Sequence, residues 1–334
     1  MTVIDTHAHL IPTEVVAAAR RGQGPDGTTV QERDGVPWMV HRQGYAYPLP
    51  PHFHDVDARL RHMDTCGVTR AVLSAPPTFF LYWTSPQETV ETARLLNESL
   101  AAAARTHPGR LAAVATLPMT DPVAAAAELR RSVVELGLVG AQIGPHVEGT
   151  TLDSPRMEPV LATAAELGVP LIIHPYYVGS DPVLHDFYLT NLLGNPWQTT
   201  VCASRLMLSG TLDRLPGLKL LLVHGGGYLP LATGRLDHGH RVRPELAHLT
   251  ARPSEYLRRF HYDTLTHDPA TLRWLLQAVG ADRVVFGSDT PFDMGNTSLH
   301  EQLGPGRLTA SALSAVSHTN AESLFGLPEV GSDA

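Results

Sequence analysis

The chain has 334 residues and a formal net charge of -8 at pH 7. That length accommodates one large catalytic domain, since an α/β barrel commonly uses about 250 residues plus insertions as a single unit. The acidic balance and the absence of a Lys/Arg-rich tract give nucleic acid and anionic membranes no electrostatic reason to bind, so the expected partner is a small molecule.

We expect neither a membrane-spanning helix nor a secretory leader in this sequence. No apolar stretch approaches the roughly 20 residues that a membrane helix needs, and the N-terminus enters a strand without a charged leader. A soluble, cytoplasmic protein is expected. The two cysteines, Cys66 and Cys202, are too few for a disulfide framework and have no metal-binding spacing, so we expect them to be buried.

Short apolar segments alternate with longer segments of helical period, which is typical of βα units around a parallel sheet. The expected helices include residues 85–107, 121–136 and 270–280. Eight strands favour an α/β fold of the distorted (β/α)8 TIM-barrel type, and no dinucleotide-binding or Walker-type glycine loop follows any strand. The expected strands begin at Val3, Arg70, Leu111, Leu138, Pro170, Lys219, Phe260 and Arg283.

Two connections are too long for ordinary barrel loops. Residues from about 11 to 56 follow the first strand, and residues from about 177 to 200 follow the fifth. Long insertions of this kind usually build lids and substrate pockets. We therefore expect one barrel domain over residues 1–327, in which the 11–56 insertion forms a lid or pocket wall, and a disordered tail over residues 328–334.

The only lysine, Lys219, lies at the entrance of the sixth expected strand. In a barrel that end of the strand lies away from the loops that carry the chemistry. Schiff-base and carbamylated-lysine mechanisms are therefore not expected.

The first strand ends in Asp5-Thr6-His7-Ala8-His9. Side chains alternate along a strand, so His7 and His9 point to the same side, and two imidazoles so placed can share a metal. By itself the pair is also compatible with two hydrogen-bonded polar residues at a strand end.

Three further strands end in groups that can bind a metal. His174 ends LIIHP, His224 ends LLLVHGGG and Asp289 ends VVFGSD. A lone buried histidine is more often a hydrogen-bonded core residue, but a barrel brings all of these strand ends to one rim. The combined set predicts a metal site at the C-terminal mouth of the barrel.

This constellation resembles the amidohydrolase superfamily over nearly the whole chain. The segments IDTHAHL, GAQIGPH, IIHP, VHGGGYLPLATGRLDHGHR and GSDTPF resemble in particular the branch that contains the aminocarboxymuconate-semialdehyde, resorcylate and carboxyvanillate decarboxylases. The resemblance implies one divalent metal per chain, with zinc expected and manganese the alternative, and a homodimer.

We expect His7, His9, His174 and Asp289 to hold this metal, with coordination left open for water or substrate. Binuclear members of the superfamily generally bridge two metals with a carbamylated lysine at the end of the fourth strand. This sequence has Gln142 there, which favours a single metal.

The resemblance makes His224 the acid/base catalyst beside the metal, and an ordinary imidazole pKa of about 6.5 suits proton transfer at neutral pH. The alternative is that His224 is a further ligand. The glycines at 225–227 either let the backbone approach a ligand or simply form a tight βα turn.

The resemblance also makes Arg235 a clamp for the substrate carboxylate, within its own subunit or across to a neighbouring one, because a guanidinium pairs well with a carboxylate. The alternative is a surface or helix-capping arginine. Further expected substrate contacts are Phe53, His54, Trp83, Gln142 and Asn191, and weaker pocket candidates are His146, Asp263 and His267.

One departure from the family pattern bears on the substrate. The aminocarboxymuconate enzyme has a second carboxylate-binding arginine in a segment that reads GYAYPLPPHFHDVDA here, with no arginine before Arg59, which we expect within a helix. A more aromatic pocket follows, and a muconate dicarboxylate is not expected as the substrate.

The leading hypothesis is a metal-dependent nonoxidative decarboxylase of a phenolic or unsaturated carboxylic acid, with the proton delivered by His224 or Asp289. No organic cofactor is required, because an ortho hydroxyl or a conjugated carbonyl can accept the electrons. The first alternative is a hydrolase or hydratase that directs a metal-activated water at a lactone, amide or enol-type substrate. The second is a non-catalytic barrel with structural histidines.

Overall fold

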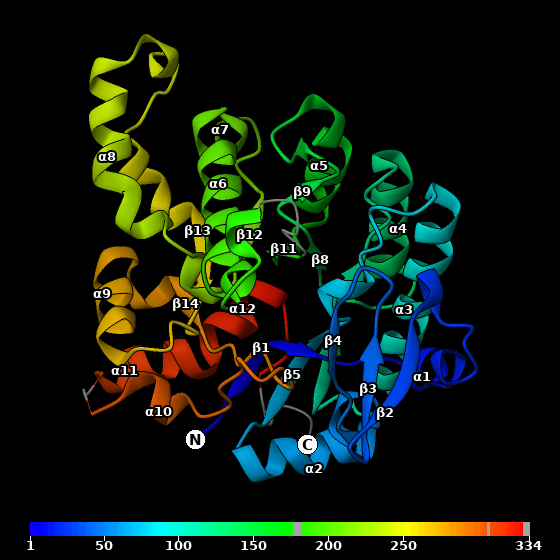
Figure 1. Cartoon of the computed structure of the whole chain (residues 1–334). Helices are drawn as coiled ribbons and strands as arrows, with labels where there is room; N and C mark the ends of the chain where they lie inside the picture. Colours follow the sequence, from blue (N-terminus) through cyan, green and yellow to red (C-terminus); the bar gives the residue numbers. More distant parts are fainter. Residues whose placement is uncertain (177–181, 306–307, 330–334) are drawn as a thin grey trace.

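The structure, a computed structural model, describes residues 1–176, 182–305 and 308–329. Parallel strands surrounded by helices form its centre (Figure 1). In chain order these strands are β1 (Ile4–His9), β5 (Arg70–Ser74), β6 (Leu111–Ala113) with β7 (Ala115–Thr116), β8 (Ala141–Ile143), β11 (Pro170–Ile173), β12 (Lys219–Leu222), β13 (Phe260–Asp263) and β14 (Val284–Val285).

These strands close into a ring. β6 and β7 are two halves of one strand interrupted at Val114, since β6 pairs with β5 and β7 pairs with β8. β1 pairs with β5 on one side. On the other side the Thr6 amide donates to the Phe286 carbonyl (2.9 Å), and Ala8 forms a parallel bridge with Thr290. The eight predicted strands and the barrel fold are therefore confirmed.

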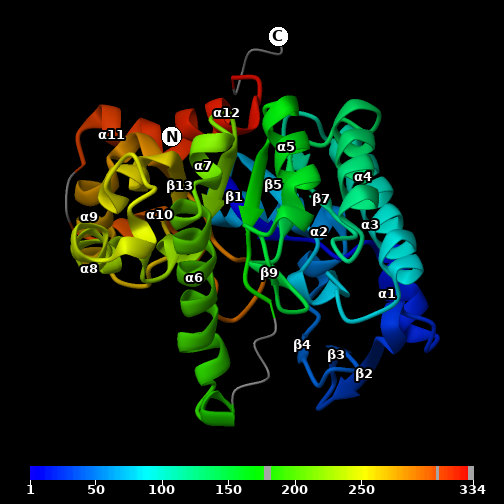
Figure 2. The same cartoon turned by 90° about the horizontal axis from the view of Figure 1, so that it is seen from above.

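The barrel interior is filled by apolar side chains and covered at one end by a helix. α12 (Asn320–Phe325) contributes Leu324 and Phe325 to this interior cluster. Figure 2 shows α12 at the end of the barrel opposite the strands of the first insertion. The mouth is thus left as the open end. The cluster also includes Ile4, Val72, Ala112, Ile172, Leu221 and Val285 in the strands, with Val114 and Val223 directly beside them.

The three helices with the clearest sequence pattern are α3 (Pro86–Thr106), α4 (Pro122–Val134) and α9 (Pro269–Val279), as predicted. Ser85, Asp121 and Asp268 cap them by accepting bonds from first-turn amides at 3.2, 3.0 and 2.7 Å. The remaining α-helices are α1 (Thr13–Arg20), α2 (Val56–Cys66), α5 (Glu158–Leu167), α6 (Asn195–Leu208), α7 (Thr211–Arg214), α8 (Leu229–Val242), α10 (Leu299–Leu303) and α11 (Ala310–Ser314).

The insertion after β1 forms structure of its own beside the barrel mouth. After α1 come the short turn η1 (Pro25–Gly27) and an antiparallel sheet of β2 (Thr29–Arg33), β3 (Val36–Val40) and β4 (Ala46–Pro48). The turn η2 (Pro51–Phe53) then leads into α2.

Two more short segments lie near the mouth. β9 (His146–Val147) and β10 (Thr150–Thr151) follow β8 as a small antiparallel pair. In the second insertion residues 177–181 lie outside the described residues, and η5 (Pro182–Leu184) and η6 (Thr190–Gly194) lead into α6.

The remaining predictions concern single residues and the chain end. Lys219 begins β12, whose other end leads to His224, so it lies away from the mouth as predicted. Cys66 and Cys202 are free, Cys202 buried and Cys66 partly buried. The Pro328 carbonyl accepts a bond from Arg70 (2.7 Å), so the predicted tail begins anchored, and residues 330–334 lie outside the described part. No described helix is both long and apolar enough to cross a membrane.

We expect Leu324→Ala to lower the free energy of unfolding by about 2–5 kcal/mol, because it opens a cavity in the barrel interior. Leu95→Ala, the same change at a side chain that is 39 % exposed on α3, is the control and should cost far less. Urea denaturation followed by circular dichroism measures both. Equal effects would contradict the role of α12 in closing the barrel.

Candidate metal centre and active site

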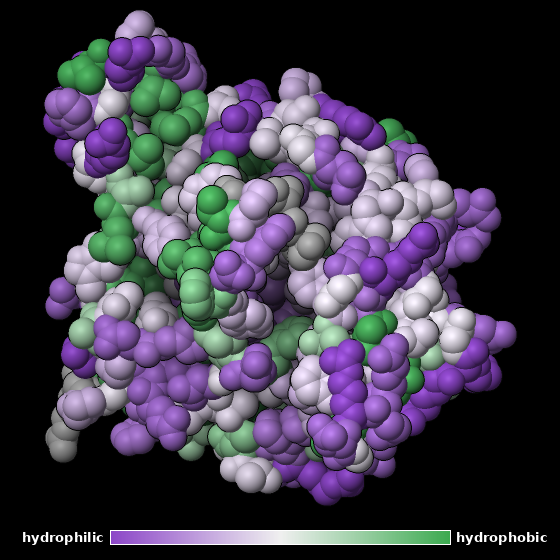
Figure 3. Space-filling model, in the orientation of Figure 1, coloured by the Kyte–Doolittle hydropathy of each residue, from purple (hydrophilic) through white to green (hydrophobic). Residues whose placement is uncertain are grey.

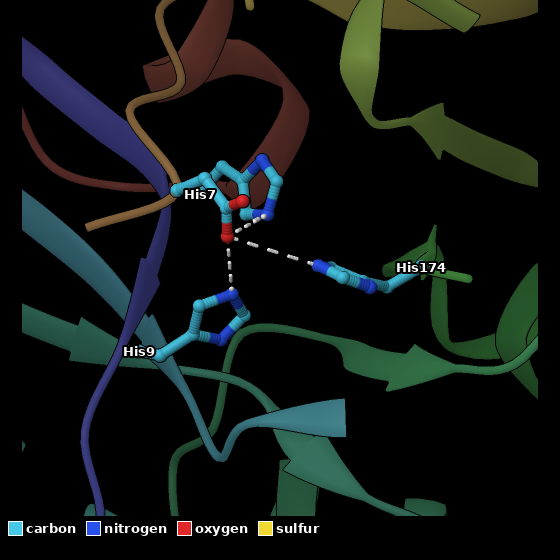
Figure 4. A group of neighbouring side chains, drawn as sticks. His7, His9 and His174 are labelled. Atoms are coloured by element: carbon cyan, nitrogen blue, oxygen red, sulfur yellow. Dashed lines mark hydrogen bonds and ion pairs between the residues drawn. The ribbon is translucent and has the colours of Figure 1, made fainter. Parts of the chain in front are cut away.

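The four predicted metal ligands meet at the barrel mouth. His7 and His9 come from β1, His174 follows β11 and Asp289 follows β14. One ligand atom from each lies within 4.8 Å of the others, and all four residues are buried. Figure 4 shows the labelled imidazoles of His7 and His9, from one strand, and of His174, from another part of the chain, converging on one point.

The Asp289 carboxylate lies at the centre of this group. Its Oδ1 atom is 3.0 Å from His9 Nε2, 3.3 Å from His7 Nε2 and 4.0 Å from His174 Nε2. Its Oδ2 atom is 3.7 Å from His224 Nε2. One carboxylate therefore faces the three imidazoles with one oxygen and His224 with the other.

Each of the three imidazoles uses its Nδ1 atom elsewhere. His7 Nδ1 is 2.8 Å from Asp263 Oδ2, His9 Nδ1 is 3.0 Å from Ser74 Oγ, and His174 Nδ1 is 2.6 Å from the Pro175 carbonyl. Such outer hydrogen bonds select the tautomer that leaves Nε2 as a metal donor.

The donor set fits a divalent metal. The Nε2 atoms of His7 and His174 are buried and have no hydrogen-bond partner among the described residues. Buried polar atoms of this kind require an explanation, and three imidazole nitrogens with a carboxylate oxygen are a normal ligand set for zinc and related ions. Among the described residues this is the one group of three or more such side chains placed to hold a metal.

The electrostatics of the cluster agree with a cation site. Burial disfavours a charged carboxylate, yet the surrounding imidazoles hold the pKa of Asp289 well below its usual range. Burial also disfavours a charged His7, but Asp289 and Asp263 raise its pKa to about 10. Without a metal the two carboxylates thus retain a proton on His7, and a bound cation would take over that positive charge.

His224 lies beside the metal ligands and opens onto the cavity. It begins the turn η7 (His224–Gly226) and adopts a left-handed φ of 54°, and Asp289 has a similar φ of 57°. Such backbone conformations are uncommon for residues other than glycine and concentrate at functional sites. The His224 side chain retains 16 % exposure, so it is accessible to a bound molecule.

The glycines after His224 form a tight turn. A Cβ at Gly225 or Gly226 would come 2.7 Å from Thr266 or 2.6 Å from the Tyr262 ring, and one at Gly227 would collide with the Pro196 carbonyl. All three have positive φ. Close packing of the backbone against α6 and β13 explains them without a ligand.

Asp263 and Gln142, predicted as pocket residues, do not line the cavity. Asp263 is fully buried and accepts from His7 and from the Gly225 amide (2.8 Å), so it orients one ligand and anchors the His224 turn. Gln142 accepts from Ser74 Oγ (2.9 Å) and thereby supports His9. Both residues act through the histidines, because the parallel strands that carry them also bury them.

Arg59 is a functional contact that the sequence pattern did not reveal. It lies in α2, as expected, but its side chain is fully buried and donates to the His9 carbonyl (2.5 Å). Asp5 nearby accepts from Ser288 Oγ (2.5 Å) and from the His7 amide (3.1 Å). A charged residue in a helix normally indicates a solvated face, so only burial in the structure exposes this role.

A cavity of about 1060 Å³ opens above the metal ligands. Among the predicted substrate contacts, His54, Trp83 and Asn191 line it. Phe53 does not: it is fully buried, and its ring packs 5.4 Å from Tyr47 and 5.3 Å from Phe292, which do line the cavity. The aromatic character predicted for this wall is present, but Phe53 contributes to it from behind.

Three other predicted residues lie elsewhere. Arg235 is exposed on α8 and does not line the cavity of its own chain, and His267 is likewise exposed and outside it. His146 is bonded to Gln198 Nε2 (2.9 Å) and Tyr176 Oη (3.3 Å) and borders a separate hollow of about 720 Å³. The structure therefore does not bring Arg235 to the cavity of its own subunit, where a clamp for the substrate carboxylate would have to lie.

The family profile described as Amidohydrolase matches residues 4–327. The chain belongs to this family. The match spans the whole barrel, from β1 with His7 and His9 to beyond Asp289, so the predicted family is confirmed.

Two curated relatives and one solved structure narrow the likeness. The chain is 35 % identical over 274 residues to 2-amino-3-carboxymuconate-6-semialdehyde decarboxylase of Dictyostelium discoideum, covering 81 % of this chain and 74 % of that protein. It is 32 % identical over 292 residues to gamma-resorcylate decarboxylase of Rhodococcus jostii, covering 81 % and 87 %.

The structure is that of a dihydroxybenzoic acid decarboxylase from Polaromonas sp. with bound manganese and the inhibitor 2-nitroresorcinol. It superposes with a TM-score of 0.80 at 28 % identity, covering 98 % of this chain and 97 % of that one. These three relatives are thus decarboxylases, in the predicted branch.

We expect about one metal per chain in the purified protein by plasma mass spectrometry, and none in a His7→Ala/His9→Ala variant.

Asp263→Asn should retain the site but weaken metal affinity by about 10- to 100-fold, because it loses the carboxylate that orients His7. Chelator competition measures the affinity, and His267→Asn, at an exposed residue in the loop after β13, is the control. Unchanged affinity in Asp263→Asn would contradict the role of this contact.

Proposed function

We propose that this protein is a metal-dependent decarboxylase that removes CO₂, without oxidation, from a phenolic or unsaturated carboxylic acid. The observation that carries the proposal is the arrangement of His7, His9, His174 and Asp289 beside His224 at the floor of an aromatic cavity. Relatives with this activity over most of the chain support it.

His7, His9, His174 and Asp289 would hold a divalent cation, which would supply a Lewis acid for the substrate carboxylate or an adjacent hydroxyl. The chain's own residues then manage the proton. His224 Nε2 and Asp289 Oδ2 are 3.7 Å apart and both reach the cavity floor. His224 can deliver a proton directly to the carbon that bears the carboxylate, and the ionised Asp289 can do so after it has first taken a proton from His224. The carbon–carbon bond to the carboxylate breaks, and its electron pair stays with the substrate as CO₂ leaves. The delivered proton forms the new C–H bond at the same carbon.

We propose zinc as the physiological metal, since three imidazoles and one carboxylate suit it. Manganese suits oxygen-rich sites better, but the Polaromonas relative contains it, so it is the alternative. Metal analysis of protein purified without added metal decides between them.

The cavity lining favours a substrate with one carboxylate and a flat apolar body. Among its described lining residues the single arginine is Arg20, and there is no lysine. The aromatic side chains that line it are Trp38, Tyr45, Tyr47, Trp83, Tyr176, Tyr188 and Phe292. An unpaired second carboxylate among these rings would be costly to desolvate. This inference agrees with the sequence, in which residues 44–58 contain no arginine at the place of the family's second carboxylate-binding arginine.

The activity test is a panel of aromatic and unsaturated carboxylic acids scored for CO₂ release, with lactones, amides and enol-type compounds assayed in parallel for water addition. CO₂ release from one or more acids supports the proposal. Turnover confined to hydrolysis or hydration would replace it with the hydrolase alternative.

We also propose a homodimer formed through α6 and α8. Figure 3 shows hydrophobic surface gathered over both helices. Large apolar patches on soluble proteins commonly mark association surfaces. Arg235 is on α8 as well, and we propose that it contacts the substrate carboxylate in the partner's cavity. The exposed side chains are Leu192, Leu193, Trp197, Val201, Leu231 and Val242.

We expect His224→Asn to lower kcat by about 10²- to 10⁴-fold, since it removes an acid/base group, while metal content stays at one per chain. Steady-state kinetics and metal analysis of the same preparation measure the two quantities. Loss of the metal instead would show that His224 is a ligand, the alternative derived from the sequence.

We expect Trp197→Asp to convert the dimer to a monomer, because a carboxylate cannot be buried unpaired at an apolar contact. Trp274→Asp, the same change at a partly exposed tryptophan on α9, should leave the dimer intact. Sedimentation velocity distinguishes the species, and a monomeric wild type would refute the dimer.

A further inference from the structure

A single carboxylate of the N-terminal insertion contacts the wall of the cavity from outside. Asp26 lies in η1, and its side chain is only 8 % exposed. It does not line the cavity itself, but two of the side chains bonded to it do, namely Trp83 and Gln43. Its backbone φ is 48°, a left-handed conformation that aspartate and asparagine adopt more readily than most residues.

The contacts of Asp26 join three segments that are distant in the sequence. Its Oδ2 atom accepts a bond from the Trp83 indole Nε1 (2.8 Å) and one from the side-chain amide of Gln43, in the turn between β3 and β4. Its backbone amide donates to Glu88 Oε1 (2.9 Å) at the start of α3. Arg42 Nη1 lies 3.8 Å from Oδ1, but its side chain is 77 % exposed, so this ion pair contributes little.

Trp83 links this carboxylate to the metal centre. Its ring lies nearly parallel to that of Tyr176, with centroids 6.3 Å apart and planes at 26°. Tyr176 follows His174 by two residues and lines the same cavity. The two rings together form an aromatic wall next to a metal ligand, and a flat substrate body can pack against such a surface.

We propose that Asp26 is a positioning residue that fixes the Trp83 indole in this wall and thereby sets the affinity for the substrate ring. The role rests on the decarboxylase function proposed above. Without the acceptor the indole can occupy other rotamers, so a smaller fraction of the molecules presents a complete wall, and apparent affinity falls in proportion. The chemical step at His224 and Asp289 is not touched.

Side-chain variants can test this role without detaching the insertion, because the bond to Glu88 comes from the Asp26 backbone. Asp26→Ala removes the carboxylate that accepts the indole N–H. Trp83→Phe approaches the same contact from the other side by removing the indole N–H. Asp34→Ala is the matched control for the strain that alanine brings at a positive φ, since Asp34 is exposed, lies in the same insertion and has a similar φ of 51°.

The kinetic experiment uses an acid from the panel that the wild type decarboxylates. It measures KM and kcat for this acid in the wild type, the two single variants, their double variant and the control. We expect KM to rise about 5- to 10-fold in each single variant with kcat within about twofold, and the double variant to match Trp83→Phe alone, because coupled residues are not additive. A fall in kcat as large as that in kcat/KM, or multiplicative effects in the double variant, overturns the proposal.

A second measurement does not depend on activity, so it separates failure of this inference from failure of the decarboxylase proposal. The fluorescence difference between wild type and Trp83→Phe isolates the Trp83 signal from those of the other three of the four tryptophans. Acrylamide should quench that signal about twofold more efficiently in Asp26→Ala, while Asp34→Ala matches the wild type. Unchanged quenching in Asp26→Ala overturns the positioning role even if CO₂ release is observed.

Discussion

The site depends on the buried carboxylate of Asp289. Its Oδ1 atom lies within 4.0 Å of three Nε2 atoms and its Oδ2 atom faces His224. A carboxylate in this position would be protonated by desolvation alone, but the imidazoles hold its pKa low. The pocket therefore holds a buried negative charge among imidazole nitrogens, and a divalent cation can replace the proton that His7 otherwise retains.

The surrounding structure keeps this arrangement in place. The Nδ1 atoms of the three histidines are occupied by Asp263, Ser74 and the Pro175 carbonyl, so the rings cannot turn away. His224 and Asp289 hold left-handed backbone conformations, which cost of order 1–3 kcal/mol each when a structure imposes them. The closed barrel and its packed interior supply the rigidity that makes those conformations persist.

The metal centre and the cavity wall come from different parts of the chain and serve different ends. The candidate ligands lie at the C-terminal ends of barrel strands, where barrel enzymes carry their active sites. The wall comes largely from the first insertion, through residues such as Trp38 and Tyr47, and from segments after β5 and β11 that carry Trp83 and Tyr176. Substrate choice in this protein therefore depends on how the insertion is held against the barrel.

By itself the sequence determined the barrel and the candidate metal ligands, because strand periodicity is local and parallel strands in a barrel place all their C-terminal ends at one rim. The family followed from the resemblance of the short motifs at those strand ends. The tertiary structure decided what each remaining residue faces. Phe53 is behind the wall, Gln142 and Asp263 support the histidines, Arg235 is on the outer surface, and Arg59 is buried against β1. Residue type and spacing do not distinguish these positions, since the direction of a side chain outside a regular strand depends on packing between segments far apart in the chain.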